Sequence, residues 1–474
     1  MGSTNTRGRT LFDKIWSRHC VKEVGRDTWL LHVDRHLIHD LVAGPALTQL
    51  AKGHRIVRSP ELTYATVDHG ISSAPGRTTD SSPVGGRLLR QMRQRVYETG
   101  IQLFDLGQDG QGIVHVMGPE LGLTLPGMLV VCGDSHTCTH GGLGAIAFGI
   151  GSSEVVHVLA TQTLRQRKPA SMRIHFDGQP GSQVTAKDLI LFAIGELGTA
   201  AGRGHAVEYA GSTVRGFDVE SRLTMCNLSI ELGAKIGLIA PDDVTFDYVS
   251  RREMAPKGAM LDQAVDYWRS LPSDEEAGFA LEHWFDAAKI APQITWGTSP
   301  QDVIPVTGRV PDPADELNTE RRQRMQSALQ YMGLQPGASI AGTKIDWIFI
   351  GSCANSRLSD LRLAAQVVGN RKVAPGVRAW VVPGSEAVKR EAQREGLDRV
   401  FKAAGFEWRE PGCSLCLAAN GESVGPGERC LSTSNRNFVG RQGRGARTHL
   451  ASPAMAAAAA VTGVITDVRR MTAG

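Results

Sequence analysis

Aromatic residues, net charge and long apolar runs are all scarce in this 474-residue sequence. Phe, Trp and Tyr make up 6% of it, and the formal net charge is +4. No segment joins clustered lysine and arginine to aromatic residues, as a nucleic-acid-binding groove does. The longest apolar run, residues 455–461, is mostly alanine and too short to span a bilayer. These absences argue against membrane and nucleic-acid partners and favour a small anion as ligand.

The beginning of the sequence has no signal-peptide apolar stretch, which predicts a cytoplasmic protein. Residues 1–6 match a loose myristoylation pattern, but no polybasic patch follows them, so we expect no lipid anchor. The eight cysteines are not expected to form disulfides in a reducing compartment. Cysteines that lie close together in this chain would therefore indicate a metal site or a catalytic role.

The pattern of strand, glycine turn and helix recurs and predicts an α/β fold of several structural units. Strands are expected at residues 129–131, 347–350 and 377–382, each followed by polar residues on a loop. A capping box from Thr185 to Asp188 predicts a new helix, and a domain boundary is expected near residue 170. Residues 296–320 are rich in proline, show little periodicity and resemble a linker.

Three cysteines form the most informative pattern. Cys413 and Cys416 make a CxxC pair between turns, and Cys353 directly follows the strand at 347–350. Structural zinc usually takes two such pairs, and a thioredoxin-type redox motif would leave Cys353 unexplained. Three thiolates on an iron-sulfur cluster leave one iron open for Lewis-acid chemistry. Cys430 remains an alternative fourth ligand, which would close that open position.

Several ordered motifs extend this pattern along the whole chain. They are GSCANSR at 351–357, PGCSLC at 411–416, SNRNFVGR at 434–441, VDRH at 33–36, TVDH at 66–69, QGIVH at 111–115, GDSHT at 133–137 and SPAM at 452–455. Together they resemble the aconitase superfamily, in its branch of isopropylmalate dehydratase large subunits. The resemblance implies three α/β/α domains around the cluster, at residues 1–170, 171–298 and 299–474. The fourth, swivelling domain is expected to be absent from this chain and supplied by a separate small subunit.

The resemblance also implies roles for individual residues. A [4Fe-4S] cluster is expected on Cys353, Cys413 and Cys416. Proton transfer is expected from Asp68, His69, His136, Glu154 and Glu231. A substrate with two carboxylates and a hydroxyl is expected to meet Asn227, Asn355, Ser356, Arg357, Asn435, Arg436 and Arg441. Asn227 and Glu231 are four residues apart in an expected helix, so both should face one point.

The implied activity is that of a hydro-lyase in leucine biosynthesis, which isomerises 2-isopropylmalate to 3-isopropylmalate through isopropylmaleate. The base that removes the C–H proton is expected on the small subunit. Ala354, Gly70 and residues 107–109 depart from the residues common in the family. These departures leave open a paralogue acting on a citramalate-, dimethylmalate- or homocitrate-type acid. An RNA-binding protein that senses cluster loss and a cluster scaffold without turnover are rival hypotheses.

Overall fold

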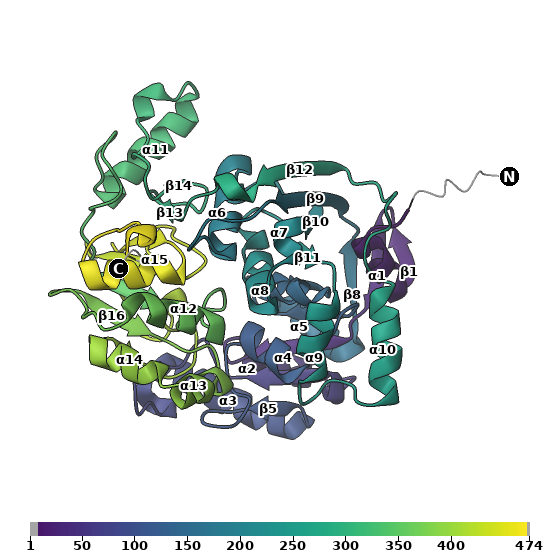
Figure 1. Ribbon diagram of the computed structural model, residues 1–474. Helices are drawn as coiled ribbons and strands as arrows, with labels where there is room; N and C mark the ends of the chain where they lie inside the picture. Colours follow the sequence, from purple (N-terminus) through teal and green to yellow (C-terminus); the bar gives the residue numbers. More distant parts are fainter. Residues whose placement is uncertain (1–7, 472–474) are drawn as a thin grey trace.

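The computed structural model describes residues 8–471 and contains several parallel β-sheets with helices packed on them (Figure 1). The myristoylation pattern at residues 1–6 lies outside the described residues. Within residues 8–471, no helix is both long and apolar enough to cross a membrane.

The first large sheet has five parallel strands in the order β5-β4-β3-β6-β7. These strands are β3 (Arg35–His39), β4 (Thr63–Thr66), β5 (Gln102–Phe104), β6 (Leu129–Cys132) and β7 (Ile146–Gly149). The helices of this region are α2 (Ala43–Lys52), α3 (Pro83–Thr99), α4 (Val114–Leu121) and α5 (Ser152–Thr161). A small antiparallel sheet of β1 (Cys20–Gly25), β2 (Thr28–His32) and β8 (Thr163–Arg167) follows α1 (Leu11–His19) in the fold.

The second sheet has four parallel strands in the order β11-β10-β9-β12. They are β9 (Ala170–Asp177), β10 (His205–Ala210), β11 (Ile236–Ile239) and β12 (Leu281–Asp286). Helices α6 (Ala186–Leu197), α7 (Ser212–Arg215) and α8 (Val219–Asn227) pack with this sheet. Helices α9 (Asp243–Ser250) and α10 (Ala259–Arg269) lie between its strands in sequence, but their buried residues belong to the hydrophobic cluster of the first sheet. The predicted capping box is confirmed: Thr185 is the N-cap of α6, and its backbone N–H donates to Asp188 Oδ2 at 2.8 Å.

The third sheet has five parallel strands in the order β17-β16-β15-β18-β19. They are β15 (Trp347–Ile350), β16 (Arg378–Val381), β17 (Glu407–Trp408), β18 (Arg429–Ser432) and β19 (Arg447–Leu450). Its helices are α11 (Thr319–Met332), α12 (Leu358–Val368), α13 (Glu386–Arg394), α14 (Leu397–Ala404) and α15 (Pro453–Thr462). Every residue of β15 is buried, as its unbroken apolar sequence predicts.

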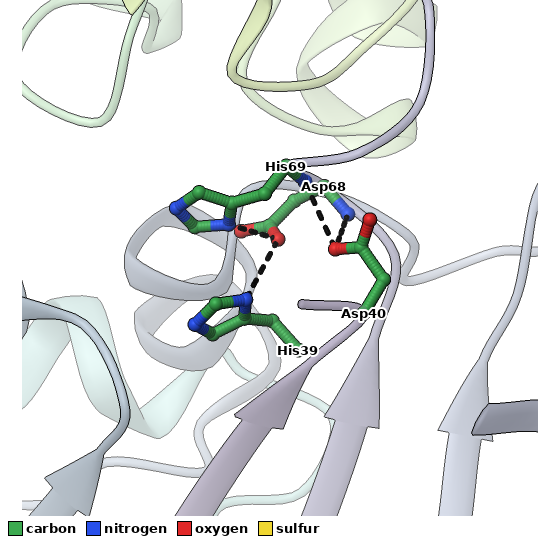
Figure 2. A group of neighbouring side chains, drawn as sticks. All are labelled: His39, Asp40, Asp68 and His69. Carbon is green, nitrogen blue, oxygen red and sulfur yellow. Dashed lines mark hydrogen bonds and ion pairs between the residues drawn. The ribbon is translucent and has the colours of Figure 1, made fainter. Parts of the chain in front are cut away.

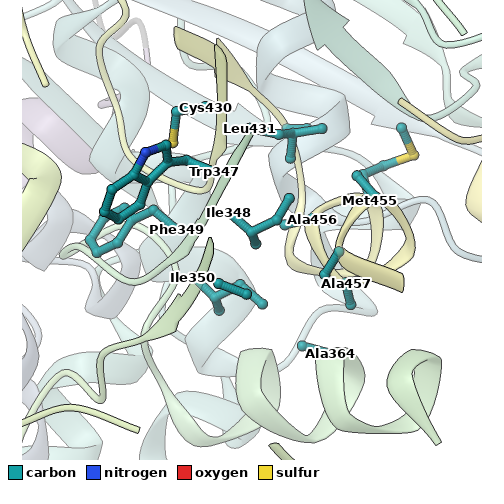
Figure 3. Close-up of a cluster of buried hydrophobic side chains, with 14 of the residues drawn as sticks. Trp347, Ile348, Phe349, Ile350, Ala364, Cys430, Leu431, Met455, Ala456 and Ala457 are labelled. Carbon is teal, nitrogen blue, oxygen red and sulfur yellow. The ribbon is translucent and has the colours of Figure 1, made fainter. Parts of the chain in front are cut away.

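The alanine-rich run noted in the sequence is the core of helix α15. Ala456 to Ala460 are all fully buried, and Figure 3 shows Ala456 and Ala457 close to Ile348 of β15. Because alanine side chains are small, this helix can pack closely against both the sheet and α12. Ala364 of α12 lies in the same cluster. The apolar run is therefore an internal helix of the third sheet's core.

Two expectations about local structure need correction. The stretch expected to be a linker contains part of an antiparallel pair, β13 (Gln293–Thr295) with β14 (Val303–Pro305), and buries Trp296 and Val306. The α-helix α8 ends at Asn227, and a 3-10 turn at Leu228–Ile230 precedes Glu231. The domain limits at 170/171 and 298/299 stay a prediction, although the strands of the three sheets occupy residues 35–149, 170–286 and 347–450.

Candidate active site

The three cysteines of the predicted cluster lie buried on two loops of the third sheet. Cys353 follows β15. Cys413 is the N-cap of a 3-10 turn after β17 (Ser414–Cys416), and Cys416 is the last residue of that turn. Two serines beside them have left-handed backbones, Ser352 with φ 77° and Ser414 with φ 48°. Such conformations cost energy for a residue with a side chain and persist where surrounding packing imposes them. The loops are thus held in shapes that fix the positions of the three thiols.

Each cysteine is joined to a residue from another part of the chain. Asn227 Nδ2 at the end of α8 lies 3.2 Å from Cys353 Sγ, and the Cys416 thiol lies 3.2 Å from Asn435 Oδ1. Asn435 also donates to Asn227 Oδ1. The Cys413 backbone N–H donates to the Asp68 carbonyl at 2.8 Å. Loops of all three large sheets therefore meet at the thiols.

The arrangement of the thiols suits a cluster better than a single ion. Among the described residues, the three sulfur atoms are not part of any group of metal-binding side chains whose ligand atoms all lie within 4.8 Å. Thiolates on one tetrahedral ion, each about 2.3 Å from the metal, would lie closer together than that. On a cluster, each thiolate binds a different iron. Burial raises the pKa of Cys353 to about 12, so a metal is needed to keep such a thiol ionised near neutral pH.

Cys430 does not join this group. It lies on β18, in register with Trp347 of β15, and its side chain is fully buried among apolar residues (Figure 3). Its environment is that of a small core hydrophobe. The alternative in which Cys430 is a fourth cluster ligand is therefore not supported.

Beside the cysteines runs an unbroken series of acid, base and cation contacts. His69 Nδ1 lies 2.5 Å from Asp68 Oδ1, and His69 Nε2 lies 2.9 Å from Asp134 Oδ2. Asp134 Oδ1 accepts from the His136 backbone N–H at 2.7 Å.

The series continues on the other side of His136. Its Nε2 lies 3.1 Å from Glu231 Oε1, which also accepts from Arg436 Nε at 2.7 Å. The sequence places these residues after β4, after β6, after α8 and after β18. The fold therefore assembles one polar series from four separate loops.

The pKa shifts of its members indicate which residues of this series are charged. Burial alone would lower the pKa of His69, but the neighbouring carboxylates, Asp68 foremost, hold it well above its usual range. Burial would raise the pKa of Asp134, yet hydrogen bonds from His115, His136 and His69 hold it well below its usual range. The pKa of Glu231 is lowered in the same way, against burial, by His136 and Arg436. His69 is accordingly a cationic proton donor between two anionic acceptors.

Asp134 was missed by the sequence analysis, although the GDSHT motif contains it. Its carboxylate contacts His69 and also lies 3.5 Å from His115 Nε2 and 3.4 Å from His136 Nδ1. His115, from the QGIVH motif, in turn meets His140 through Nδ1 at 3.1 Å. The sequence feature that could have identified Asp134 is an acidic residue in the loop that follows a buried strand, two positions before His136.

A second layer supports the Asp68-His69 pair (Figure 2). Asp40, at the end of β3, accepts the backbone N–H of His69 at 3.0 Å and of Gly70 at 2.5 Å. The His39 ring stacks on the His69 ring with centroids 4.2 Å apart. Burial, with the neighbouring His69 charge, lowers the pKa of His39 to about 4, so it stacks as a neutral ring.

The same layer explains the glycine at position 70. A Cβ atom there would lie 2.8 Å from Asp40 Oδ2 and 3.1 Å from the Cα of Gly85. Neither neighbour has room to move far, because Asp40 is itself held by backbone donors. Gly70 is therefore a packing requirement of this chain, and its departure from the family pattern carries no evidence of another substrate.

Of the residues expected to bind substrate, Asn435 and Asn227 contact the thiols, and two arginines lie beside them at the molecular surface. Arg436 is partly exposed next to Glu231, and Arg441 Nη2 lies 3.9 Å from Cys416 Sγ. Between them, Phe438 and Val439 are 48% and 58% exposed. We call Arg436, Phe438, Val439 and Arg441 the arginine face.

Arg357 is placed differently from the expectation. It is 1% exposed, and its two terminal nitrogens donate to the carbonyls of Ala354 and His115 at 3.1 Å and 3.2 Å. Asn355 Nδ2 is likewise held by Asp360 Oδ1 at 2.9 Å. Asn355 Oδ1, Ser356 Oγ and Arg357 Nε are buried without a hydrogen-bond partner among the described residues. Arg357 thus ties the Cys353 loop to the first sheet, while Asn355 and Ser356 retain buried polar atoms for another group.

Glu154 is not brought to the site. Its Oε2 caps the first turn of α5 by accepting the Gly151 N–H at 2.9 Å, and its Oε1 accepts from Gln166 at 3.0 Å. The capping box that begins α5 explains a glutamate at this position without any catalytic role. Glu154 thus has a helix-capping role in the structure, and its expected part in proton transfer stays a prediction without a supporting contact.

Three comparisons relate the chain to known proteins. The model of the aconitase family (aconitate hydratase) matches residues 13–463. The chain is 64% identical over 467 residues to 3-isopropylmalate dehydratase large subunit 1 of Bradyrhizobium diazoefficiens, covering 98% of each chain. The crystal structure of Thermococcus kodakaraensis aconitase X (holo-form) matches with a TM-score of 0.46 and 10% identity, covering 90% of this chain and 89% of that one. From the family match and the 64% identity it follows that the chain belongs to the aconitase family.

Proposed function

We propose that the chain is the large subunit of a 3-isopropylmalate dehydratase, a hydro-lyase of leucine biosynthesis acting in the cytoplasm. The observation that carries the proposal is the unbroken series from Asp68 through His69, Asp134 and Glu231 to Arg436, set directly beside three buried thiols. The name of the 64%-identical relative supports the same activity.

Cys353, Cys413 and Cys416 would hold one [4Fe-4S] cluster. The amide nitrogens of Asn227 and Asn435, 3.2 Å and 3.5 Å from Cys353 Sγ, suit such a group, because they can donate to a thiolate. Hydrogen bonds to cluster sulfurs tune the stability and potential of the cluster. When bound, the cluster supplies an iron without a protein ligand, which acts as a Lewis acid on the substrate hydroxyl.

Residues of the chain itself bind the substrate carboxylates, donate a proton and position the arginine. Arg436 and Arg441, whose planar guanidinium groups suit bidentate contacts, bind the two substrate carboxylates. His69 carries the proton that the leaving hydroxyl needs, and Asp68 and Asp134 hold its ring in place through both nitrogens. His136 and Glu231 fix the position of Arg436.

A small subunit would complete the site. The arginine face exposes two apolar side chains beside two partly exposed cations, next to the cluster cysteines. A partner seated there would exclude water from the substrate and bring the base that removes the C–H proton. The 64%-identical relative is named a large subunit, which supports a two-subunit enzyme.

The alternative of a paralogue acting on a related acid loses one of its three supports, because packing accounts for Gly70. Anaerobic reconstitution of the chain with iron, sulfide and a candidate small subunit tests the choice. Turnover of 2-isopropylmalate, citramalate and homocitrate is followed through the absorbance of the unsaturated product. We expect 2-isopropylmalate to have the highest kcat/KM. A higher kcat/KM for another acid would replace the proposed substrate, and no turnover of any acid would refute the hydro-lyase.

A further inference from the structure

A buried lysine lies behind the loop that carries Asn435 and Arg436. Lys187 is the second residue of α6 and is 1% exposed. Its Nζ donates to the carbonyls of Thr433 at 3.0 Å and Ser434 at 2.7 Å. Among residues 8–471, no carboxylate oxygen lies within 4.0 Å of this ammonium group.

Both the position and the burial of Lys187 oppose its charge. The first turn of a helix carries the positive end of the helix dipole, where cations are disfavoured. A buried ammonium group without a paired anion is costly. A lysine in such a place needs a favourable interaction that the ordinary contacts of the helix do not supply.

The nearby carboxylates are engaged elsewhere. Asp188 accepts from Thr185 and from the Gln293 backbone N–H at 2.8 Å. Asp360 accepts from Asn355 and from the Arg357 backbone N–H at 3.0 Å. Burial raises the pKa of Asp188 to about 6 and that of Asp360 to about 7, so both are weak counter-ions.

The remaining anions within electrostatic reach are cluster ligands. Burial lowers the pKa of Lys187, and the charges that oppose this are Asp360 first and then Cys353 and Cys416. Three thiolates more than offset the positive charge of an oxidised [4Fe-4S] core, so the bound cluster is a buried anion. Lys187 is a buried cation bound to the two carbonyls directly before Asn435, and Asn435 itself contacts Cys353 and Cys416.

We propose that Lys187 is the cationic counterpart of the cluster: its charge stabilises the anionic cluster, and its two hydrogen bonds position the loop that begins with Asn435. This inference rests on the proposed function insofar as it requires a cluster on the three cysteines. Lys187 touches neither substrate nor cysteine, so it is a positioning and electrostatic residue.

Variants of the reconstituted full-length chain test this role without substrate or small subunit. Lys187→Met removes charge and donor, Lys187→Gln removes only the charge, and Lys187→Arg retains both. The readouts are the midpoint potential of the cluster and the rate at which its visible absorbance is lost in air. Loss of a nearby positive charge disfavours the reduced cluster and favours oxidation. In the Met and Gln variants we expect a roughly tenfold shift in the reduction equilibrium, which makes the midpoint potential about 59 mV more negative for a one-electron couple. We also expect the cluster of these two variants to bleach faster in air.

Arg429→Met is the matched control. Arg429 is also buried and donates to a carbonyl, that of Met332, but the charges that shift its pKa are those of Arg447 and Asp346, not those of the cluster cysteines. Its loss should lower stability and leave the cluster potential unchanged. If Lys187→Met does not fold, the comparison of Gln with Arg decides, because only the Gln variant lacks the charge. Equal potentials and bleaching rates in loaded Gln, Arg and unsubstituted chains would overturn the role of Lys187. Failure of the unsubstituted chain to assemble any cluster would instead count against the proposed function.

Discussion

His69 Nε2 lies 2.9 Å from Asp134 Oδ2, a contact that joins the loop after β4 to the loop after β6. Both ring nitrogens of His69 are therefore held by carboxylates, since Nδ1 meets Asp68. A cationic imidazole held at both nitrogens has a fixed ring orientation. This geometry distinguishes Asp134 from an ordinary loop aspartate.

Asp134→Asn should therefore lower kcat by roughly a hundredfold or more, within the usual range for a misplaced general acid. The substitution keeps the size of the side chain but removes the anion that favours protonated His69. Steady-state kinetics of the reconstituted two-subunit enzyme measure the effect, with iron content as a check on loading. Asp243→Asn, on an exposed aspartate paired with Arg269, is the control. Similar kcat values for the two variants would remove Asp134 from the proton path.

Cys353→Ser should lose the cluster while the chain still folds. The three thiols come from two loops, and two ligands hold a cluster far less firmly than three. Iron and sulfide analysis with visible absorbance measures loading, and circular dichroism reports the fold. Cys430→Ser is the matched control, because Cys430 is equally buried but lies in the apolar core. Full iron content in the Cys353 variant would contradict the ligand assignment.

Arg436→Lys should raise KM for the dicarboxylate by about tenfold, because an ammonium group cannot make the paired contacts of a guanidinium group. Its contact with Glu231 at 2.7 Å would also change. Initial rates over a range of substrate concentrations separate KM from kcat. Arg444→Lys, an exposed neighbour on the same loop, should leave both constants unchanged. An unchanged KM in the Arg436 variant would exclude this residue as a carboxylate ligand.

Gly70→Asn, which introduces the residue common in the family, should lower the free energy of unfolding by about 1–3 kcal/mol, as overpacking of a tight site does. The new Cβ atom would press against Asp40 and shift the backbone that carries His69. Urea unfolding of the chain measures the loss. Gly76→Asn is the control, since a Cβ there meets nothing within 4 Å and asparagine tolerates its left-handed backbone. Equal stability of the two variants would mean that the layer around Asp40 adapts.

The sequence predicted the local elements well where one signal dominated. The apolar strand before Cys353 and the capping box at Thr185 are both present, because burial and N-capping act over a few residues. The residues around the thiols were identified by motif, and the structure brings His69, Asn227, Asn435 and Arg436 together.

Sequence reasoning is weakest where a role depends on which neighbour a side chain meets. Glu154 follows a glycine N-cap, so its carboxylate is used by its own helix. Arg357 is an arginine beside a cluster cysteine, yet two carbonyls occupy its guanidinium group. Asp134 was overlooked because its partners, His69 and His115, come from loops that only the tertiary structure brings near. Contacts of this kind are long-range, and no local pattern encodes them.

The most direct test of the central claim is formation of the unsaturated acid from 2-isopropylmalate by the reconstituted two-subunit enzyme, with and without His69→Gln. The two proteins are loaded with equal iron, and the absorbance of the product is followed in a single turnover. We expect rapid formation with the unsubstituted enzyme and a rate lower by about a hundredfold or more with the variant, because glutamine cannot donate the proton as an acid. Equal rates for the two loaded enzymes, or no unsaturated acid from the unsubstituted one, would contradict a dehydratase whose proton comes from His69.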